Sequence, residues 1–236
     1  MVTNSITAAQ RRSNTLCARG HKDIRYAVTT VLAGIPPLDL TVEKRSIRHR
    51  YKKKYFPVIW NRLEPFVIHR TLPLKALDYM LEMRVLEAWD RVYRESVPEG
   101  HWCWTLIPSV TAEGMELVQR PNFLLSQAIS GHGAFKAYLY RIGKRTSPLC
   151  RCGAHDQTPQ HVFQECNLYA EGRPLDWSNG LIEDLRHYLI ETTRRLWQEE
   201  KEEVRTGINC TRRGSHHRGR RTGAPIRGAG PAPASR

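Results

Sequence analysis

Four side chains that bind metals well lie within residues 150–166 of this chain. They follow the pattern Cys150-x-Cys152-x8-His161-x4-Cys166. Three thiolates and one imidazole form a closed tetrahedral ligand set, which is typical of structural zinc sites. Because four protein ligands leave no position for a water molecule, such a zinc ion stabilises the fold and takes no part in catalysis. The spacing therefore predicts a structural zinc site.

Two alternatives remain open from the residues alone. A Cys-x-Cys pair is tighter than the common Cys-x2–4-Cys turn, so His155, inside the same loop, competes with one of the two cysteines as a ligand. The simpler alternative is that these are buried cysteines and a surface histidine without any metal. We favour zinc because all four side chains share one short segment with a turn followed by a helix start.

The helix start is Thr158 followed by Pro159, which puts His161 in the first helical turn. Five residues separate His161 from Cys166, an angle of about 140° on an ideal α-helix. Both side chains can reach one ion only if the helix loosens before Cys166. The other cysteines, Cys17, Cys103 and Cys210, have no partner at ligand spacing, and we interpret them as ordinary thiols.

Common catalytic signatures are absent from the sequence. It contains no G-x-x-x-x-G-K-[ST], G-x-G-x-x-G, G-x-S-x-G or H-E-x-x-H motif, and no adjacent Asp-Asp pair. His132 lies between Gly131 and Gly133, and a histidine in a turn is the simpler interpretation of that pattern. The sequence thus favours a binding function over catalysis.

The charge of the chain favours a polyanion as partner. It has 236 residues with 37 Lys+Arg against 23 Asp+Glu, a formal net charge of +14. Residues 42–54 contribute seven basic and one acidic side chain, and the tail 206–236 contributes seven arginines and no acid. We expect RNA or DNA as the partner, with no membrane and no small-molecule substrate. No apolar stretch approaches the roughly 20 residues of a membrane helix, and the start MVTNSITAAQRRS lacks the apolar core of a secretory signal.

The candidate phosphate contacts lie in two places. The first is the segment before and within the cysteine cluster, where cations alternate with the rings of Phe135, Tyr138 and Tyr140. The second is the basic run, which ends in three consecutive lysines. The candidates are Lys136, Arg141, Lys144, Arg145, Arg151, Lys52, Lys53 and Lys54. One interpretation is that the rings stack on single-stranded bases. The better interpretation is that the rings, at helical spacing, belong to the hydrophobic core, while the cations stay available to phosphate.

The expected fold is mainly α-helical, with a small CCHC zinc-knuckle-like module and a disordered basic tail. Apolar periodicity and Pro or Gly punctuation predict helices over 23–33, with Asp23 as cap, and over 38–51, 73–95 and 180–204. A helical stretch over 122–142 is broken near Gly131 and Gly133. Residues 101–110 are predicted to be extended, and the end of the last helix, QEEKEEVR, to be a solvated face.

We divide the chain into five segments: 1–55 helical with the basic run, 56–125 helical connector, 126–175 CCHC module, 176–205 amphipathic helix, and 206–236 disordered Arg/Gly-rich tail.

Several of these motifs together resemble a known family. The resemblance covers roughly residues 8–175, and its residues are Gln10-Arg11-Arg12, the stretch 31–40, Glu43-x-Arg45, Trp102-x4-Ile107-Pro108, Ser126-Gln127, Gly131-His132-Gly133-x-Phe135-x2-Tyr138-Leu139, Pro148-x-Cys150-x-Cys152-Gly153 and Thr158-x2-His161-Val162-x3-Cys166. This pattern resembles the C-terminal end of the reverse-transcriptase polyproteins of type-1 non-LTR retrotransposable elements. The clade that inserts into arthropod ribosomal RNA genes is the most similar.

The resemblance implies that Cys150, Cys152, His161 and Cys166 are the CCHC ligands of that family. It also implies a region that assists binding of RNA or target DNA, in the nucleus and in cytoplasmic ribonucleoprotein. The polymerase, with its catalytic aspartates, and the endonuclease would lie before Met1 and belong to the parent polyprotein, so this fragment alone is expected to be non-catalytic. Alternatives are the RNA-directed DNA polymerase itself, known only through this piece, or a protein-interaction module derived from it.

Overall fold

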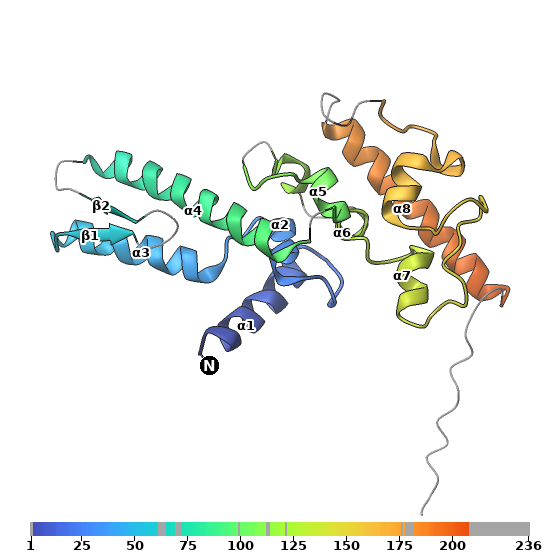
Figure 1. Ribbon diagram of the computed structural model, residues 1–236, viewed down its shortest axis with the longest axis horizontal. Helices are drawn as coiled ribbons and strands as arrows, with labels where there is room; N and C mark the ends of the chain where they lie inside the picture. Colours follow the sequence, from blue (N-terminus) through green and yellow to red (C-terminus); the bar gives the residue numbers. More distant parts are fainter. Residues whose placement is uncertain are drawn as a thin grey trace, which may run out of the picture.

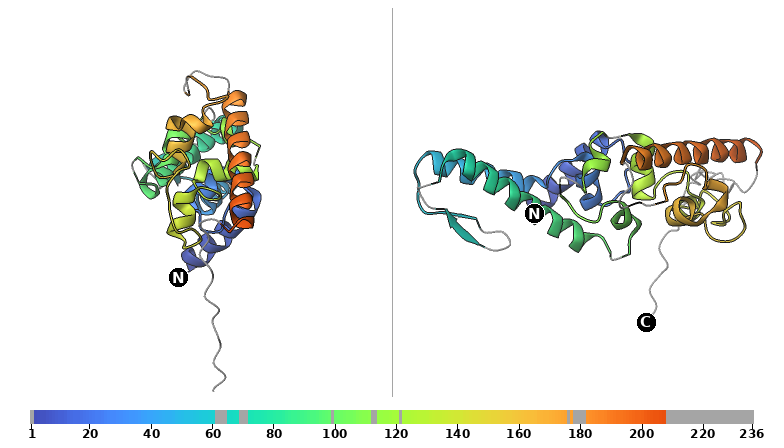
Figure 2. Two further views of the ribbon diagram at one scale, coloured as in Figure 1. Left: turned by 90° about the vertical axis from the view of Figure 1, so that its right-hand side faces the viewer. Right: turned by 90° about the horizontal axis from the view of Figure 1, so that it is seen from above.

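The computed structural model describes residues 2–60, 65–68, 72–98, 100–111, 114–120, 122–175, 177 and 182–207. The chain is elongated, with α3 and α4 extending toward one end and α6–α8 at the other (Figures 1 and 2). The elements in order are α1 Val2–Cys17, α2 Tyr26–Ala33, α3 Leu38–Lys52, β1 Val58–Trp60, β2 Phe66–Ile68, α4 Leu74–Ser96, α5 Trp102–Leu106, η1 Glu116–Val118, α6 Phe123–Ser130, α7 Lys136–Arg141, η2 His161–Glu165, η3 Asn167–Tyr169 and α8 Ile182–Arg205. The predicted mainly helical fold is confirmed.

Most predicted helices form where proline and glycine residues in the sequence predict their ends. The helices expected over 38–51, 73–95 and 180–204 are α3, α4 and α8. α2 ends at Gly34, whose φ of 65° is left-handed, and Pro36 and Pro37 follow directly. The cap was placed wrongly, because α2 begins after Arg25, two residues later than an Asp23 cap predicts.

One end of the molecule is built from α3, α4 and a short strand pair. Apolar side chains such as Ile47, Leu77 and Leu81 are buried on the facing sides of the two helices. On their exposed edges the helices are joined by the ion pair of Arg48 with Asp78, at 2.6 Å from Nε to Oδ1. β1 and β2 pair antiparallel beside α3, an element that the sequence analysis did not predict.

The predicted extended segment 101–110 is wrong, because it begins with the helix α5. The His101 ring caps this helix, since its Nδ1 accepts a hydrogen bond from the Cys103 N–H at 3.2 Å. The Trp102 indole donates to the Ala128 carbonyl at 2.7 Å, and its ring stacks on Phe163 with centroids 5.7 Å apart. Contacts with distant segments therefore decide the conformation here.

The break predicted within 122–142 divides that stretch into α6 and α7. Asn122 caps α6 by accepting from the Leu124 N–H at 2.8 Å, and Gly131 ends it with a φ of 70°. Gly133 has a φ of 130°, and a Cβ there would lie 1.9 Å from Gln127 Oε1. That amide oxygen accepts a hydrogen bond from the Trp197 indole of α8 at 2.6 Å. The glycine therefore makes room for the contact that joins α6 to α8.

Two further expectations concern the membrane and the tail. Among the described helices, none combines the length and the apolar character that a membrane span needs. The predicted disordered tail lies outside the described residues except for Thr206 and Gly207. The five-segment division of the chain stays a prediction.

We expect Gly133→Ala to destabilise the fold more than Gly143→Ala does. Both glycines have positive φ, but a Cβ on Gly143 meets nothing within 4 Å, whereas one on Gly133 collides with Gln127. Overpacking of this kind costs about 1–3 kcal/mol beyond the backbone strain that both substitutions share. Urea unfolding of the two variants measures the difference, and equal midpoints would contradict the steric role of Gly133.

Candidate metal centre

A tight loop over residues 148–157 positions the first two cysteines. The Cys150 N–H donates to the His155 carbonyl at 2.9 Å, and the Gln157 N–H donates to the Pro148 carbonyl at 2.8 Å. Gly153 turns the chain with a φ of 79°, and its N–H donates to the Cys150 carbonyl at 3.0 Å. These backbone bonds fix the loop without using the thiols, which stay available as ligands.

A single turn of π-helix, η2, positions the other two ligands. The N–H of His161, at its start, donates to Thr158 Oγ1 at 3.1 Å, as expected for a helix start at Thr158. The Cys166 N–H then donates to the His161 carbonyl at 2.7 Å, the i to i+5 bond of a π-turn. Cys166 itself is extended, with φ −72° and ψ 123°. The loosening that the spacing required is therefore present.

The four predicted ligands converge on one point. Their ligand atoms all lie within 4.8 Å of one another. Cys150 Sγ lies 3.8 Å from Cys166 Sγ, and Cys152 Sγ lies 3.2 Å from His161 Nε2. A tetrahedral zinc ion with Zn–S bonds of about 2.3 Å has sulfur–sulfur edges of about 3.8 Å. The donor set and its spacing fit a tetrahedral metal ion.

Neighbouring groups orient two of the ligands. Glu165 Oε2 lies 3.2 Å from His161 Nδ1, so a proton on Nδ1 leaves the Nε2 lone pair directed at the cluster. Arg173 donates to the Cys166 carbonyl at 2.6 Å and to the Val162 carbonyl at 3.3 Å. These bonds hold the backbone on both sides of the π-turn. Sequence reasoning missed Arg173, because no ligand motif includes it.

The alternative ligand His155 is not part of the cluster. Its ring packs edge-on against the His161 ring, with centroids 5.4 Å apart, while its carbonyl serves the loop hydrogen bond to Cys150. The cluster instead contains both members of the Cys-x-Cys pair. The tight spacing thus allows both sulfur atoms to approach one point. Of the remaining cysteines, Cys17 is exposed, Cys103 is buried, and Cys210 lies outside the described residues.

The two cysteines of the pair differ in their acidity. Burial raises the pKa of the Cys150 thiol to about 12. The pKa of Cys152 falls to about 6, first because the Ala154 N–H donates to its sulfur and then because the His161 ring lies beside it. At neutral pH Cys152 is therefore mainly a thiolate, the form that binds metals and attacks electrophiles.

The centre is not an independent module, because its π-turn is built into the core of the helical half. Phe163, within η2, is fully buried among the rings of Trp102, Phe135 and Tyr188. The Tyr188 hydroxyl of α8 donates to the Phe163 carbonyl at 3.1 Å and to the Tyr169 carbonyl at 2.8 Å. One side chain of α8 thus joins η2 and η3, the two helical turns that follow the loop over residues 148–157.

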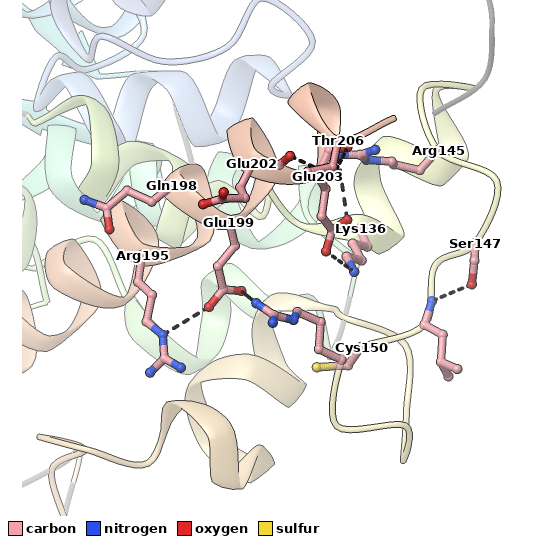
Figure 3. A pocket seen from close by; sticks show the side chains of 12 residues that line it. Lys136, Arg145, Ser147, Cys150, Arg195, Gln198, Glu199, Glu202, Glu203 and Thr206 are labelled. Carbon is pink, nitrogen blue, oxygen red and sulfur yellow. Dashed lines mark hydrogen bonds and ion pairs between the residues drawn. The ribbon is translucent and has the colours of Figure 1, made fainter. Parts of the chain in front are cut away.

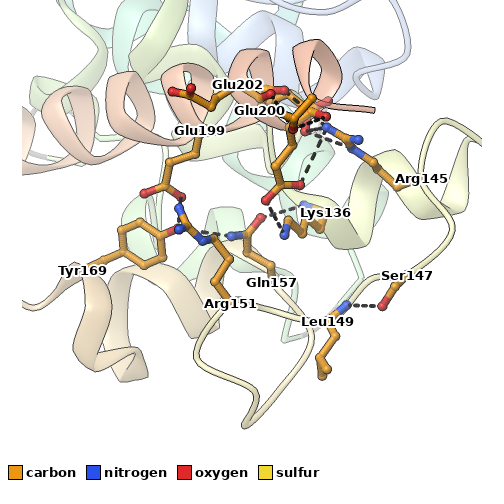
Figure 4. Close-up of polar contacts among 12 residues, drawn as sticks. Lys136, Arg145, Ser147, Leu149, Arg151, Gln157, Tyr169, Glu199, Glu200 and Glu202 are labelled. Carbon is orange, nitrogen blue, oxygen red and sulfur yellow. Dashed lines mark hydrogen bonds and ion pairs between the residues drawn. The ribbon is translucent and has the colours of Figure 1, made fainter. Parts of the chain in front are cut away.

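The end of α8 is only partly the solvated face that its sequence predicted: Gln198, Lys201, Glu202 and Arg205 are exposed, whereas Glu199, Glu200 and Glu203 are half-buried. These three carboxylates point toward the cysteine loop and α7, where they meet three of the candidate phosphate contacts (Figures 3 and 4). The pairs are Lys136 with Glu203 at 2.8 Å, Arg145 with Glu200 at 2.7 Å, and Arg151 with Glu199 at 3.5 Å. Arg145 is only 2% exposed. In this structure Lys136 and Arg145 are therefore held in ion pairs, and their contact with phosphate stays a prediction.

The other candidate cations lie on the surface in two separate places. Arg141 and Lys144 are exposed at the end of α7, and the Arg141 guanidinium lies 5.4 Å from the centroid of the Tyr138 ring. The three lysines, Lys52, Lys53 and Lys54, are exposed at the C-terminal end of α3, in the opposite half of the molecule (Figure 1).

The rings of this region belong mainly to the core, as the better of the two interpretations had it. Phe135 and Tyr138 are buried, whereas Tyr140 is half exposed. The His132 ring fits the turn-histidine interpretation, because its Nδ1 lies 2.8 Å from the Ser130 carbonyl and its ring contacts Tyr138.

The fold and site define a mainly helical chain with a Cys3His cluster capable of holding a metal. No protein-family model and no solved structure matches it. Curated relatives do match. The chain is 28% identical over 154 residues to the "Retrovirus-related Pol polyprotein from type-1 retrotransposable element R1" of Bradysia coprophila, covering 64% of this chain and 15% of the relative. It is 29% identical over 180 residues to the "Putative 115 kDa protein in type-1 retrotransposable element R1DM" of Drosophila melanogaster, covering 72% and 17%.

A third relative is the "Retrovirus-related Pol polyprotein from type-1 retrotransposable element R1 2" of Nasonia vitripennis. It is 25% identical over 173 residues, which cover 73% of this chain and 42% of the relative. The chain thus spans less than half the length of each of these relatives. The matches support the resemblance seen in the sequence: the chain is similar, over 64–73% of its length, to parts of proteins of insect type-1 retrotransposable elements of the R1 kind.

We expect the metal-free protein to be alkylated first at Cys152. Its sulfur is exposed and has a pKa of about 6, whereas Cys150 and Cys166 are buried. Pulsed iodoacetamide followed by peptide mass spectrometry measures each rate, with the exposed Cys17 as the reference within the same chain. The Cys152 rate should rise with pH through about 6 and level off by pH 7. A rate still climbing steeply above pH 8 would contradict the lowered pKa.

Proposed function

We propose that this chain is a zinc-containing, nucleic-acid-binding part of a retrotransposon Pol polyprotein and is itself non-catalytic. The observation that carries the proposal is the convergence of Cys150, Cys152, His161 and Cys166 at tetrahedral spacing. When bound, zinc would supply no chemistry beyond cross-linking the cysteine loop to the π-turn, because all four positions are protein ligands.

The exposed cations support the nucleic-acid part of the proposal. Lys52, Lys53 and Lys54 form one group, and Arg141 with Lys144 beside the half-exposed Tyr140 forms another. Lysine and arginine side chains bind phosphates and release condensed counterions, and exposed rings stack on bases. The partner in this proposal is RNA or target DNA.

The activity of the larger protein is also a proposal. Two of these relatives, those of Bradysia coprophila and Nasonia vitripennis, are named Pol polyproteins, and this chain covers only part of each. We infer that the parent protein is an RNA-directed DNA polymerase with an endonuclease and that the rest of it is a partner of this chain. Action on chromosomal DNA would place the protein in the nucleus, and binding of the element's RNA would place it in cytoplasmic ribonucleoprotein.

We expect the purified protein to contain one zinc ion per chain. His161→Ala and Cys166→Ala each remove one ligand and should lower both the zinc content and the melting temperature. His155→Ala is the matched control, because that ring lies beside the cluster without belonging to it. Atomic-emission metal analysis and thermal unfolding give the two readouts. Zinc near zero in the wild type as well as the variants would refute the metal centre.

We expect replacement of Lys52, Lys53 and Lys54 by glutamine to weaken binding to a single-stranded RNA. Loss of three phosphate contacts should reduce the slope of log affinity against log salt by about 2. A control of equal charge change replaces the exposed cations Arg194, Lys201 and Arg205 of α8. Fluorescence anisotropy over a salt series measures both variants. Equal slopes in the two variants would show that net charge alone, and not the end of α3, governs binding.

A protein-interaction module is the second candidate, and one feature favours it. A groove of about 570 Å³ between α1, α3 and β1 is bordered by the exposed apolar side chains Ile6, Leu38, Val42 and Ile59. Absence of RNA and DNA binding at low salt, together with binding of another polyprotein segment, would favour this candidate.

A further inference from the structure

A cleft beside the metal centre contains more charge than its packing requires. It has a volume of about 810 Å³ and lies between the end of α8 and the loop that leads to Cys150. Figure 3 shows basic side chains entering it from both walls, with acidic side chains of α8 between them. Its charged lining residues are Lys136, Arg145, Arg151, Arg195, Glu199, Glu202 and Glu203.

Two carboxylates neutralise three of these cations. Glu199 lies between two arginines, 3.1 Å from Arg195 and 3.5 Å from Arg151. Glu203, one helical turn further on, contacts Lys136 at 2.8 Å. A row of cations on opposite walls of an open cleft is the arrangement that follows a phosphate backbone. In this structure the chain's own carboxylates occupy the positions where phosphates would bind.

The ion pairs differ in how far they support the fold. The Arg151 and Arg195 side chains are each about half exposed, at 53% and 48%, and such pairs contribute little to stability. Glu199 also accepts a hydrogen bond from the buried Tyr169 hydroxyl at 2.7 Å, so it has a structural contact besides these pairs. Lys136 and Glu203 are both mostly buried, and Glu203 Oε2 lies 3.8 Å from Arg145, whose main partner is Glu200 at 2.7 Å.

We propose that this cleft is a binding site for the phosphate backbone of single-stranded nucleic acid and that Glu199 and Glu203 mask it. The proposal rests on the nucleic-acid-binding function and deepens it. Nucleic acid and the end of α8 compete for Lys136, Arg151 and Arg195, and the wild-type chain therefore binds through its exposed cations at low affinity. When the two carboxylates move away, the cations of the cleft also contact the nucleic acid.

The test is the double variant Glu199→Gln/Glu203→Gln of the full chain, which keeps side-chain size and leaves Glu200 with Arg145. The probe is an unstructured oligouridylate or oligothymidylate. Three released cations should steepen the slope of log affinity against log salt by about 2, at about 0.7 per phosphate contact. The control Glu183→Gln/Asp184→Asn makes the same charge change at the exposed start of α8 and should keep the wild-type slope.

Substitution of Lys136 tests whether the gain in binding arises in the cleft rather than elsewhere on the surface. In the wild type, Lys136→Gln should leave affinity nearly unchanged, because Glu203 already holds that lysine. In the double variant the same substitution should remove about 0.7 of the gained slope. If the double variant proves unstable, Glu199→Gln alone releases two half-exposed arginines and should steepen the slope by about 1.4.

The outcomes distinguish the two levels of the proposal. A wild-type slope in the folded double variant, or an equal gain in the control, would overturn the masked cleft and leave nucleic-acid binding intact. If neither the wild type nor any variant binds the probe at low salt, the proposed function itself fails. Far-UV circular dichroism and zinc content show whether each variant keeps the fold.

Discussion

The metal centre depends on one hydrogen bond, from the Cys166 N–H to the His161 carbonyl at 2.7 Å. In a regular α-helix, five residues of separation would point these side chains about 140° apart. The wider π-turn and the extended backbone at Cys166 bring them to one side, where Cys150 and Cys152 approach from the loop. Arg173 donates to the carbonyl of Cys166 and so helps to hold this backbone conformation.

The helix α8 is the scaffold on which both the centre and the cleft depend. Its first half contributes Tyr188, which joins the turns on either side of Cys166 through two carbonyl hydrogen bonds. Its second half contributes Glu199, Glu200 and Glu203, which pair with cations from α7 and the cysteine loop. One helix therefore contacts both the turns beside the metal ligands and the cations that line the cleft.

How much of this could be predicted depends on whether a feature is local. Helices that end at Gly34 or follow Pro37 and Pro73 are marked in the sequence, and they form where expected. A loosening of the helix before Cys166 was predicted too, because His161 and Cys166 could not otherwise reach one ion, but the π-turn that provides it was not predicted. Residues 101–110 were predicted wrongly, because Trp102 takes its conformation from Ala128 and Phe163, which are distant in the chain.

Ion pairing was the least predictable feature, because it too depends on residues that are distant in the chain. Arg145 and Glu200 are separated by 55 positions, and neither local charge pattern indicates the other. The run QEEKEEVR is typical of a solvated helix end, and only the return of the metal loop against α8 converts it into a partner for cations. The two three-residue strands were missed because their stability comes from pairing with each other rather than from a periodic pattern.

These pairings change what the net charge of +14 means. Each internal pair removes one cation from the set that can meet a phosphate, so a count of basic residues is only an upper limit on contacts. In the run 42–54, Lys44 and Arg48 are held by Glu82 and Asp78 of α4, while the three terminal lysines are exposed. Among the candidate phosphate contacts, basic charge therefore combines with exposure at the end of α3, at the end of α7 and at Arg151. The candidate cations beside the metal centre are instead paired with acids of α8, namely Lys136 with Glu203, Arg145 with Glu200 and Arg151 with Glu199.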